Sequence, residues 1–172
     1  MSLANVRAYL KQFKLDTRIQ EFQTSSATVE LAAQALKCEP CRIAKTLSFD
    51  LNGETLLIVA AGDCKIDNAK YKQTFQTKAK MLQADEVVLK TGHAIGGVCP
   101  FAVPENVKIY LDVSLKRFKT IFPACGSANS AIELSLKELE QYTINQGWVD
   151  VCKLIEPTKK ASEYFGSSLM NF

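Results

Sequence analysis

Histidine is almost absent from this chain, and long hydrophobic runs are missing altogether. Its 172 residues include one histidine, His93. Any catalytic or metal centre that needs two histidines is therefore excluded. No apolar stretch approaches the roughly 20 residues that cross a bilayer. The N-terminus also lacks the basic and apolar series of a signal peptide, so we expect a cytoplasmic protein that does not enter a membrane.

Charge of one sign is not in excess either. The 21 lysines and arginines nearly balance the 18 aspartates and glutamates, which leaves a net charge of +3. This value excludes a protein that coats nucleic acid, although it would not repel a phosphate backbone. With 47% hydrophobic and 23% charged residues, the composition is that of a globular domain. We expect one domain over residues 1–156 and a C-terminal tail over 157–172, mobile or docked.

The six cysteines do not form the pattern of a disulfide scaffold, which belongs to small secreted chains. Cys38 and Cys41 have the two-residue spacing of a zinc knuckle or a redox pair, but no second pair follows. We therefore expect free thiols, with no metal and no cofactor. A zinc or redox protein built on this pair stays open as an alternative function.

The most informative residue is a lysine within an apolar strand. Residues 43–51 alternate with period two and place Lys45 on the same face as four large apolar side chains. Asn52-Gly53 then predicts a two-residue hairpin turn, which sets Lys45 opposite the small Ala60. A lysine there must pair, reach the sheet edge or lose its proton. Both a lysine that extends to the sheet edge and a cation at the floor of a pocket fit this pattern.

The remaining periodicity predicts short helices and strands without a regular βαβ rhythm. Helices are expected over residues 3–13, after hydroxyl caps at 24–26, from Asp67 to Phe75, around Met81 and over 136–142, and a short helix or a turn is expected over 84–90. Further strands are expected over 18–22, 107–112, 120–124, 131–134 and 148–151. This order indicates a single α+β domain with a mixed, mostly antiparallel, barrel-like sheet surrounded by helices.

A glycine-rich loop is the second chemical feature. Residues 91–101 contain three glycines within six positions: Gly92, Gly96 and Gly97. Such a loop lets backbone N–H groups converge on an oxyanion or a phosphate. The loop matches neither of the common nucleotide-binding glycine motifs, so nucleotide hydrolysis has no support. A plain turn is the alternative.

Together these segments resemble a known family. Lys45-Thr46, the Asn-Gly hairpin, Ala61-Gly62-Asp63, the loop from Thr91 to Phe101, Asp112 and the turn at Gly126 occur here in the order seen in YbaK-type aminoacyl-tRNA deacylases. That family includes the editing domain inserted in bacterial prolyl-tRNA synthetases. The resemblance covers residues 13–153. It implies hydrolysis of the ester of mischarged tRNA, carrying cysteine, alanine or a related small amino acid, for translation fidelity.

The resemblance also implies the site. Lys45 matches the functional lysine of the family, and residues 96–100 match its G-x-x-x-P loop, which makes Lys45, Gly96 and Gly97 the catalytic candidates. The expected substrate-binding residues are Thr46, Val98, Pro100, Gly126, Phe22, Ser25, Ala60 and Asp112. The expected partners are the aminoacylated acceptor end of tRNA and an aminoacyl-tRNA synthetase. Because no synthetase body is present, we expect action in trans.

Two further expectations concern mechanism and regulation. A Ser-His-acid triad would have to use His93, inside the flexible loop, so a water molecule or the substrate itself is the expected proton handler. Cys99 and Cys125 lie in segments expected to meet at the site, where a thiol near Lys45 would ionise more readily and oxidation could close the site. Inert buried thiols are the alternative, and the one that we favour. The alternative function is a non-catalytic module that binds aminoacyl-tRNA or an amino acid and associates with a synthetase.

Overall fold

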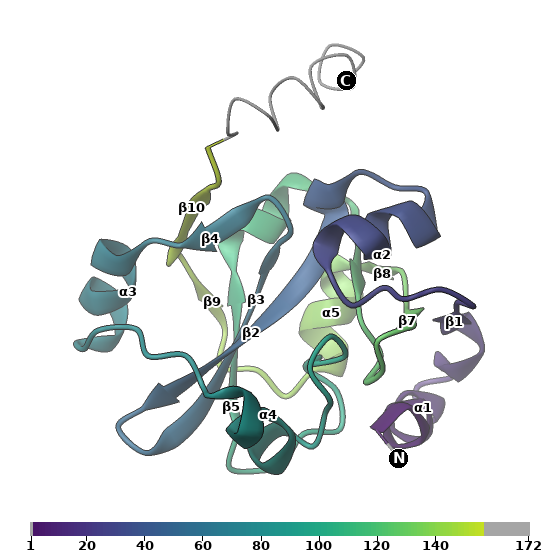
Figure 1. The fold of residues 1–172 in the computed structure, drawn as a ribbon, viewed down its shortest axis with the longest axis horizontal. Helices are drawn as coiled ribbons and strands as arrows, with labels where there is room; N and C mark the ends of the chain where they lie inside the picture. Colours follow the sequence, from purple (N-terminus) through teal and green to yellow (C-terminus); the bar gives the residue numbers. More distant parts are fainter. Residues whose placement is uncertain (1, 157–172) are drawn as a thin grey trace.

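The computed structural model describes residues 2–156 (Figure 1). Its helices are α1 (Ser2–Lys11), α2 (Val29–Leu36), α3 (Asn68–Phe75), α4 (Ala84–Thr91) and α5 (Leu136–Tyr142), with short 3-10 turns η1 (Asp16–Arg18), η2 (Pro40–Arg42) and η3 (Val113–Arg117). Its strands are β1 (Gln20–Glu21), β2 (Ile43–Leu51), β3 (Glu54–Ala61), β4 (Cys64–Ile66), β5 (Lys108–Asp112), β6 (Thr120–Pro123), β7 (Ser130–Ala131), β8 (Leu134–Ser135), β9 (Trp148–Val149) and β10 (Cys152–Leu154).

A six-stranded mixed sheet forms the centre, in the order β8-β6-β2-β3-β5-β9. The β2–β3 hairpin is its longest pairing and runs antiparallel, while β2–β6, β3–β5 and β5–β9 are parallel. Two small antiparallel ribbons, β1–β7 and β4–β10, lie outside it. Helices surround the sheet: α3 lies on its left side in Figure 1, α2 and α5 on its right and α4 below. The predicted α+β fold with a curled mixed sheet is confirmed.

The hairpin has the register that the sequence predicts. Asn52 and Gly53 both take positive φ, +51° and +90°, as a tight two-residue turn requires. Leu51 therefore pairs with Glu54, and Lys45 pairs with Ala60. All eight residues of β3 except Glu54 are buried, because β3 is the inner strand between β2 and β5. The aromatic ring of Phe49, from β2, packs 5.3 Å from that of Tyr71 on α3.

Within residues 2–156, the other edge of β2 is paired only near its two ends. Ile43 and Ala44 pair with β6, and Phe49 bridges to Met81. Ser48 accepts a backbone hydrogen bond from Leu82 next to that bridge. Residues 45–47 lie between these two pairings, so the sheet has a gap in its hydrogen-bonded edge at the position of Lys45.

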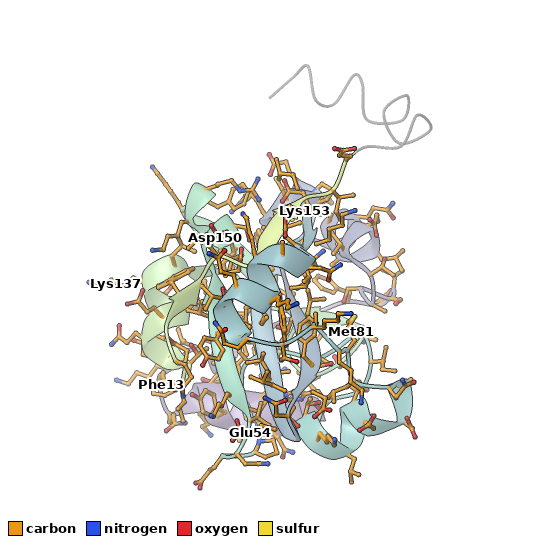
Figure 2. All side chains as sticks on the ribbon, turned by 90° about the vertical axis from the view of Figure 1, so that its left-hand side faces the viewer. Phe13, Glu54, Met81, Lys137, Asp150 and Lys153 are labelled. Atoms are coloured by element: carbon orange, nitrogen blue, oxygen red, sulfur yellow. The ribbon has the colours of Figure 1, made fainter. Side chains whose placement is uncertain are left out.

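Several local predictions are wrong. No helix contains Met81, which instead bridges to β2 and leaves 56% of its surface exposed (Figure 2). The N-cap of α2 is Thr28, whose hydroxyl accepts from the backbone N–H of Leu31, and not one of residues 24–26. The strand expected over 18–22 shortens to β1, because Asp16–Arg18 form a 3-10 turn. The strand expected over 131–134 divides into β7 and β8.

The sequence pattern also does not predict the pairing of strands β4 and β10. β4 and β10 pair with each other across 86 positions, with Cys152 opposite Ile66. The predicted tail over 157–172 lies outside the described residues. Among the helices within residues 2–156, none has the length and apolar character needed to cross a membrane.

Candidate active site

A cavity of about 360 Å³ lies at the open edge of β2. Its walls come from β2 (residues 43–48), the start of α2 and the segment before it (26–29 and 32), the segment into α4 (81, 82, 84 and 87), the glycine loop (95, 96 and 98) and β6–β7 (122, 124, 130 and 131). Six consecutive strand residues border it, although their side chains alternate between faces. The cavity lies beside the edge of the strand, so side chains from both faces of β2 can border it.

Lys45 borders the cavity and is partly buried. Its ammonium group donates a hydrogen bond to the backbone carbonyl of Cys64 at the start of β4. Burial lowers the pKa of Lys45, and the negative charge of Asp63 partly opposes this effect. Within residues 2–156, the Cys64 carbonyl is the one hydrogen-bond acceptor seen for this ammonium, which has three N–H donors. The other two donors have no hydrogen-bond partner within these residues, and the Cys64 carbonyl itself lies outside the cavity lining.

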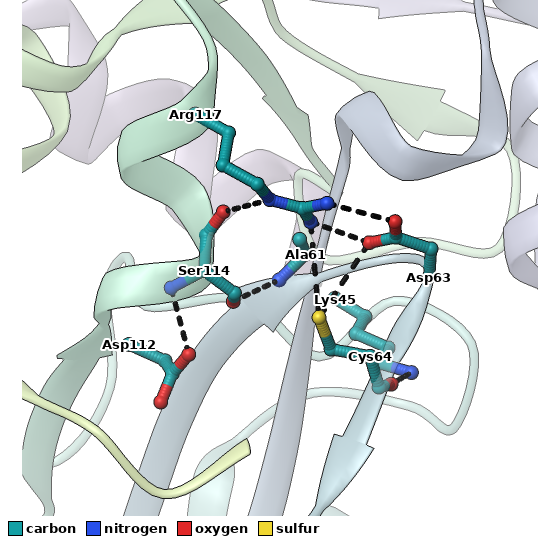
Figure 3. A network of polar contacts seen from close by, with 7 residues as sticks. All are labelled: Lys45, Ala61, Asp63, Cys64, Asp112, Ser114 and Arg117. Carbon is teal, nitrogen blue, oxygen red and sulfur yellow. Dashed lines mark hydrogen bonds and ion pairs between the residues drawn. The ribbon is translucent and has the colours of Figure 1, made fainter. Parts of the chain in front are cut away.

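A polar network fixes the loop that holds Lys45 (Figure 3). Arg117 binds both carboxylate oxygens of Asp63, at 2.9 and 2.5 Å, and its Nε donates to the carbonyl of Ser114 at 2.8 Å. Burial raises the pKa of Asp63, but the hydrogen bonds and charge of Arg117 outweigh burial and lower it. The Ser114 hydroxyl in turn accepts from the N–H of Ala61. The segment that presents the Cys64 carbonyl is thereby tied to η3.

The glycine loop packs closely against two other walls of the cavity. Gly96 has a φ of +88°, and a Cβ there would lie 2.8 Å from the Cβ of Ala27. A Cβ on Gly97 would lie 2.5 Å from the backbone nitrogen of Ser127. The N–H of Gly97 donates to the carbonyl of Ala94 at 2.9 Å, so it is already occupied. The backbone N–H groups that remain as oxyanion candidates are those of Gly96 and Val98, which both border the cavity.

His93 lies behind the loop rather than in the cavity. Its side chain is 1% exposed, its Nε2 is 2.7 Å from the carbonyl of Phe101, and its Nδ1 contacts the hydroxyl of Ser2. Burial lowers the pKa of His93. A Ser-His pair therefore exists, but a carbonyl stands where a triad has a carboxylate, and neither residue borders the cavity. His93 fixes the loop to α1.

The hypothesis of a reactive thiol at the site is wrong, and the favoured alternative of inert buried thiols is confirmed. Cys99 and Cys125 are fully buried, and neither borders the cavity. Burial raises the pKa of Cys99 to about 12 and raises that of Cys125 well above its usual value. Thiols in such surroundings stay protonated and inert. The two residues do come close together, as expected, but inside the core.

The structure brings some of the other predicted site residues to the cavity and leaves the rest outside its lining. Thr46, Gly96 and Val98 border it together with Lys45. Residues 22, 25, 60, 97, 100, 112 and 126 do not.

Each of the residues outside the lining has a visible structural role. The Asp112 carboxylate accepts from the N–H groups of Ser114 and Val151. Ala60, fully buried, is the sheet partner of Lys45. Gly126 has a φ of +91°, and Ser2 packs where its Cβ would be, since a Cβ there would lie 2.7 Å from the Ser2 hydroxyl oxygen. Pro100 is buried, and the Ser25 hydroxyl accepts from the N–H of Ala27. Phe22 exchanges hydrogen bonds with Asn129.

Ser26 is the cavity residue that the sequence pattern misses. Its side chain is 7% exposed, and its hydroxyl has no hydrogen-bond partner within residues 2–156. The run Thr24-Ser25-Ser26 contains the signal, but a hydroxyl run before a helix predicts a cap first. For metals, the described part of the chain shows no group of three histidine, cysteine or acidic side chains that could hold an ion.

Comparison with known proteins places this geometry in a family. The model of the aminoacyl-tRNA editing domain matches residues 24–142, more than half of the chain. The uncharacterised protein YwhH of Bacillus subtilis is 56% identical over 154 residues, which cover 89% of this chain and 98% of YwhH. EbsC of Enterococcus faecalis, provisionally named a Cys-tRNA(Pro)/Cys-tRNA(Cys) deacylase, is 26% identical over 83% of this chain and 89% of its own.

A solved structure has the same fold. The crystal structure of a provisionally assigned trans-editing enzyme for prolyl tRNA synthetase superposes with a TM-score of 0.79 at 27% identity, covering 88% of this chain and 97% of that one. The residues matched by the family model, 24–142, include the β2–β3 hairpin and the glycine loop, which both border the cavity. This chain therefore belongs to the aminoacyl-tRNA editing domain family, the YbaK-type family that its sequence resembles.

Proposed function

We propose that this protein hydrolyses the ester bond of mischarged aminoacyl-tRNA and acts in trans. One observation carries the proposal: a single cavity joins the Lys45-Thr46 strand edge to the Gly96 loop. A cation and free backbone N–H groups are what an ester carbonyl needs as it becomes an oxyanion. Related proteins named as deacylase and trans-editing enzyme support the same reaction class.

The reaction needs a water molecule and no cofactor. The water oxygen attacks the carbonyl carbon of the ester, the bond from that carbon to the ribose oxygen breaks, and the ribose oxygen takes up a proton. The N–H groups of Gly96 and Val98 would stabilise the negative charge on the carbonyl oxygen, an effect worth about 3 kcal/mol for one donor. Lys45 would use its two remaining donors on the ester or on the terminal phosphate, and its low-dielectric surroundings strengthen both contacts.

No side chain of the cavity is suited to act as a general base. Among the described residues, its lining contains no carboxylate, imidazole or thiol, and its single ionisable group is Lys45. The only histidine is held behind the loop. The proton of the attacking water would therefore pass to a second water or to a group of the substrate, such as the neighbouring ribose hydroxyl or the α-amine. Positioning and electrostatics would supply the rate enhancement.

Recognition of the tRNA would be limited to its acceptor end. The chain carries a net charge of only +3, which is too small for an extended phosphate-binding surface. We infer that the accepted aminoacyl group is cysteine, alanine or a related small amino acid, carried by a proline-accepting tRNA among others. A synthetase would be the partner that supplies further tRNA specificity.

The test is release of labelled amino acid from cysteinyl-, alanyl-, seryl- and prolyl-tRNA, including mischarged proline-accepting tRNA. The wild type should release at least one of them faster than buffer does. Ala124→Leu, which fills the cavity beside β6, should lose this activity, whereas Ala69→Leu on the exposed face of α3 should retain it. Binding of the same tRNAs without any release would instead identify the non-catalytic module.

A further inference from the structure

Two buried hydroxyl groups at the cavity have no hydrogen-bond partner within residues 2–156. They belong to Ser26, just before α2, and to Thr46, in the open part of β2. The lining contains three more hydroxyls: two of them are already used, and that of Ser48 shows no hydrogen bond within these residues. Thr28 caps α2 by accepting from the N–H of Leu31 at 3.2 Å, and the Ser130 oxygen lies 2.6 Å from that of Ser127. Ser26 and Thr46 are therefore the lining residues whose hydroxyl oxygen is both covered and without a partner within the described residues.

A buried hydroxyl without a partner is unfavourable and uncommon. At least nine-tenths of buried polar groups in folded proteins have a partner, and leaving one without costs about 1–3 kcal/mol. Ser26 and Thr46 come from different segments of the chain, so a single local distortion of the backbone does not explain both. Each oxygen is covered by its neighbours in this structure, so a ligand that pairs with it requires a change of χ1 rotamer. A ligand group that can pair with both would offset the cost.

The rest of the cavity restricts the chemistry of that group. In the described residues its lining contains no carboxylate to bind a cationic side chain, and alanines at positions 27, 32, 44, 124 and 131 make room for a short one. A side-chain hydroxyl is both a donor and an acceptor, so it can bind to two hydroxyls at once. A methyl group of the same size can bind to neither.

We propose that Ser26 and Thr46 select an aminoacyl group whose side chain carries a hydroxyl, as serine and threonine do. This inference rests on the proposed function, since it assigns the specificity of the same site. Each enzyme–substrate hydroxyl bond is a neutral hydrogen bond, worth about fivefold in rate or affinity. The wild type should therefore prefer seryl over alanyl ester, and threonyl over its isostere valyl ester, by about tenfold or more.

The experiment compares these four esters on one tRNA, so that the tRNA contribution cancels in each ratio. Ser26→Ala and Thr46→Val should each lower the seryl/alanyl and threonyl/valyl rate ratios about fivefold. Thr46→Ser, which keeps the hydroxyl, should keep the seryl/alanyl ratio high. Thr74→Val, an exposed threonine of α3 outside the cavity lining, is the matched control and should leave both ratios at the wild-type value.

The outcomes separate the two proposals. If the wild type hydrolyses alanyl and valyl esters as fast as their hydroxyl counterparts, the inference is overturned while the deacylase function stands. Ratios that survive both Ser26→Ala and Thr46→Val would also overturn it. If the wild type hydrolyses none of the four esters but does release cysteine from cysteinyl-tRNA, the hydroxyl preference fails alone. Hydrolysis of no ester at all would refute the proposed function itself.

Discussion

Replacing Gly97 by alanine should damage both stability and activity, because there is no room for a side chain at this position. A Cβ on Gly97 would lie 2.5 Å from the backbone nitrogen of Ser127 and 2.7 Å from the carbonyl carbon of Gly126. Contacts this short cannot be relieved by turning a side chain, since all of the atoms belong to backbone. The loop would have to move away from the turn at 126–127, and the N–H groups of Gly96 and Val98 would move with it.

The size of the effect follows from the overlap. Forcing a methyl group into packed surroundings costs about 1–3 kcal/mol. For a chain of this length, that loss corresponds to a Tm lower by roughly 2–12 °C. Urea unfolding followed by circular dichroism would give the free energy, and deacylation by the folded protein would give the rate. We expect the deacylation rate to fall by a larger factor than the fraction of folded protein does. The reason is that the glycine loop is displaced in the folded variant as well.

Gly53→Ala is the matched control. Gly53 has a φ of +90° in the hairpin turn, and its Cβ would meet no atom within 4 Å. This substitution should cost about 1 kcal/mol through backbone strain alone and should not change the rate of the folded protein. The reasoning is refuted if Gly97→Ala unfolds at the wild-type urea concentration, or if the two alanine variants lose equal activity.

Three further predictions concern ionisable groups. Burial lowers the folded-state pKa of His93 below 6.5, so its contribution to stability is complete above pH 6.5. As pH falls below 6.5, the free energy of unfolding should decrease by at most about 1.4 kcal/mol per pH unit. His93→Gln should flatten this part of the plot of unfolding free energy against pH, and parallel plots for the two proteins would contradict the assignment. Hydrogen bonding to Arg18 lowers the pKa of Glu138 to about 2, so the stability from this pair is present above pH 4.5 and is lost as pH falls through 2. Glu138→Gln should therefore cost about 1 kcal/mol at pH 7 and much less at pH 2, as measured by urea unfolding, and an equal cost at both pH values would contradict this assignment. Cys99 and Cys125 should resist iodoacetamide in the native protein and react only in urea, and mass spectrometry that finds either one alkylated without urea would show that these thiols are accessible.

The sequence determines the hairpin well because its information is local. An alternating strand, an Asn-Gly turn and a second apolar strand fix the register, and with it the pairing of Lys45 with Ala60. The glycine loop could be recognised for the same reason. Its three glycines lie within six residues, although which N–H groups stay free depends on the turn from Gly97 to Ala94.

The cavity itself could not be predicted, because it forms where a pairing is missing. The sequence predicts a helix around Met81. In the structure Met81 instead pairs with Phe49, and this bridge marks one end of the unpaired edge of β2. The β4–β10 pairing joins three-residue strands that are far apart in the sequence, and such short strands are stabilised by their partners rather than by their own pattern. Asp112 matches a family motif, but its carboxylate binds two backbone N–H groups, which no spacing rule indicates.

The central claim is that ester hydrolysis takes place at the cavity beside Lys45. The most direct test compares single-turnover deacylation by wild type, Lys45→Ala and Lys65→Ala on the best substrate of the panel. Lys65 is an exposed lysine on β4 that does not border the cavity. We expect Lys45→Ala to lower the rate by about a hundredfold or more, the typical loss for one charge-stabilising group, and Lys65→Ala to retain it. Equal rates for wild type and a folded Lys45→Ala would contradict the account.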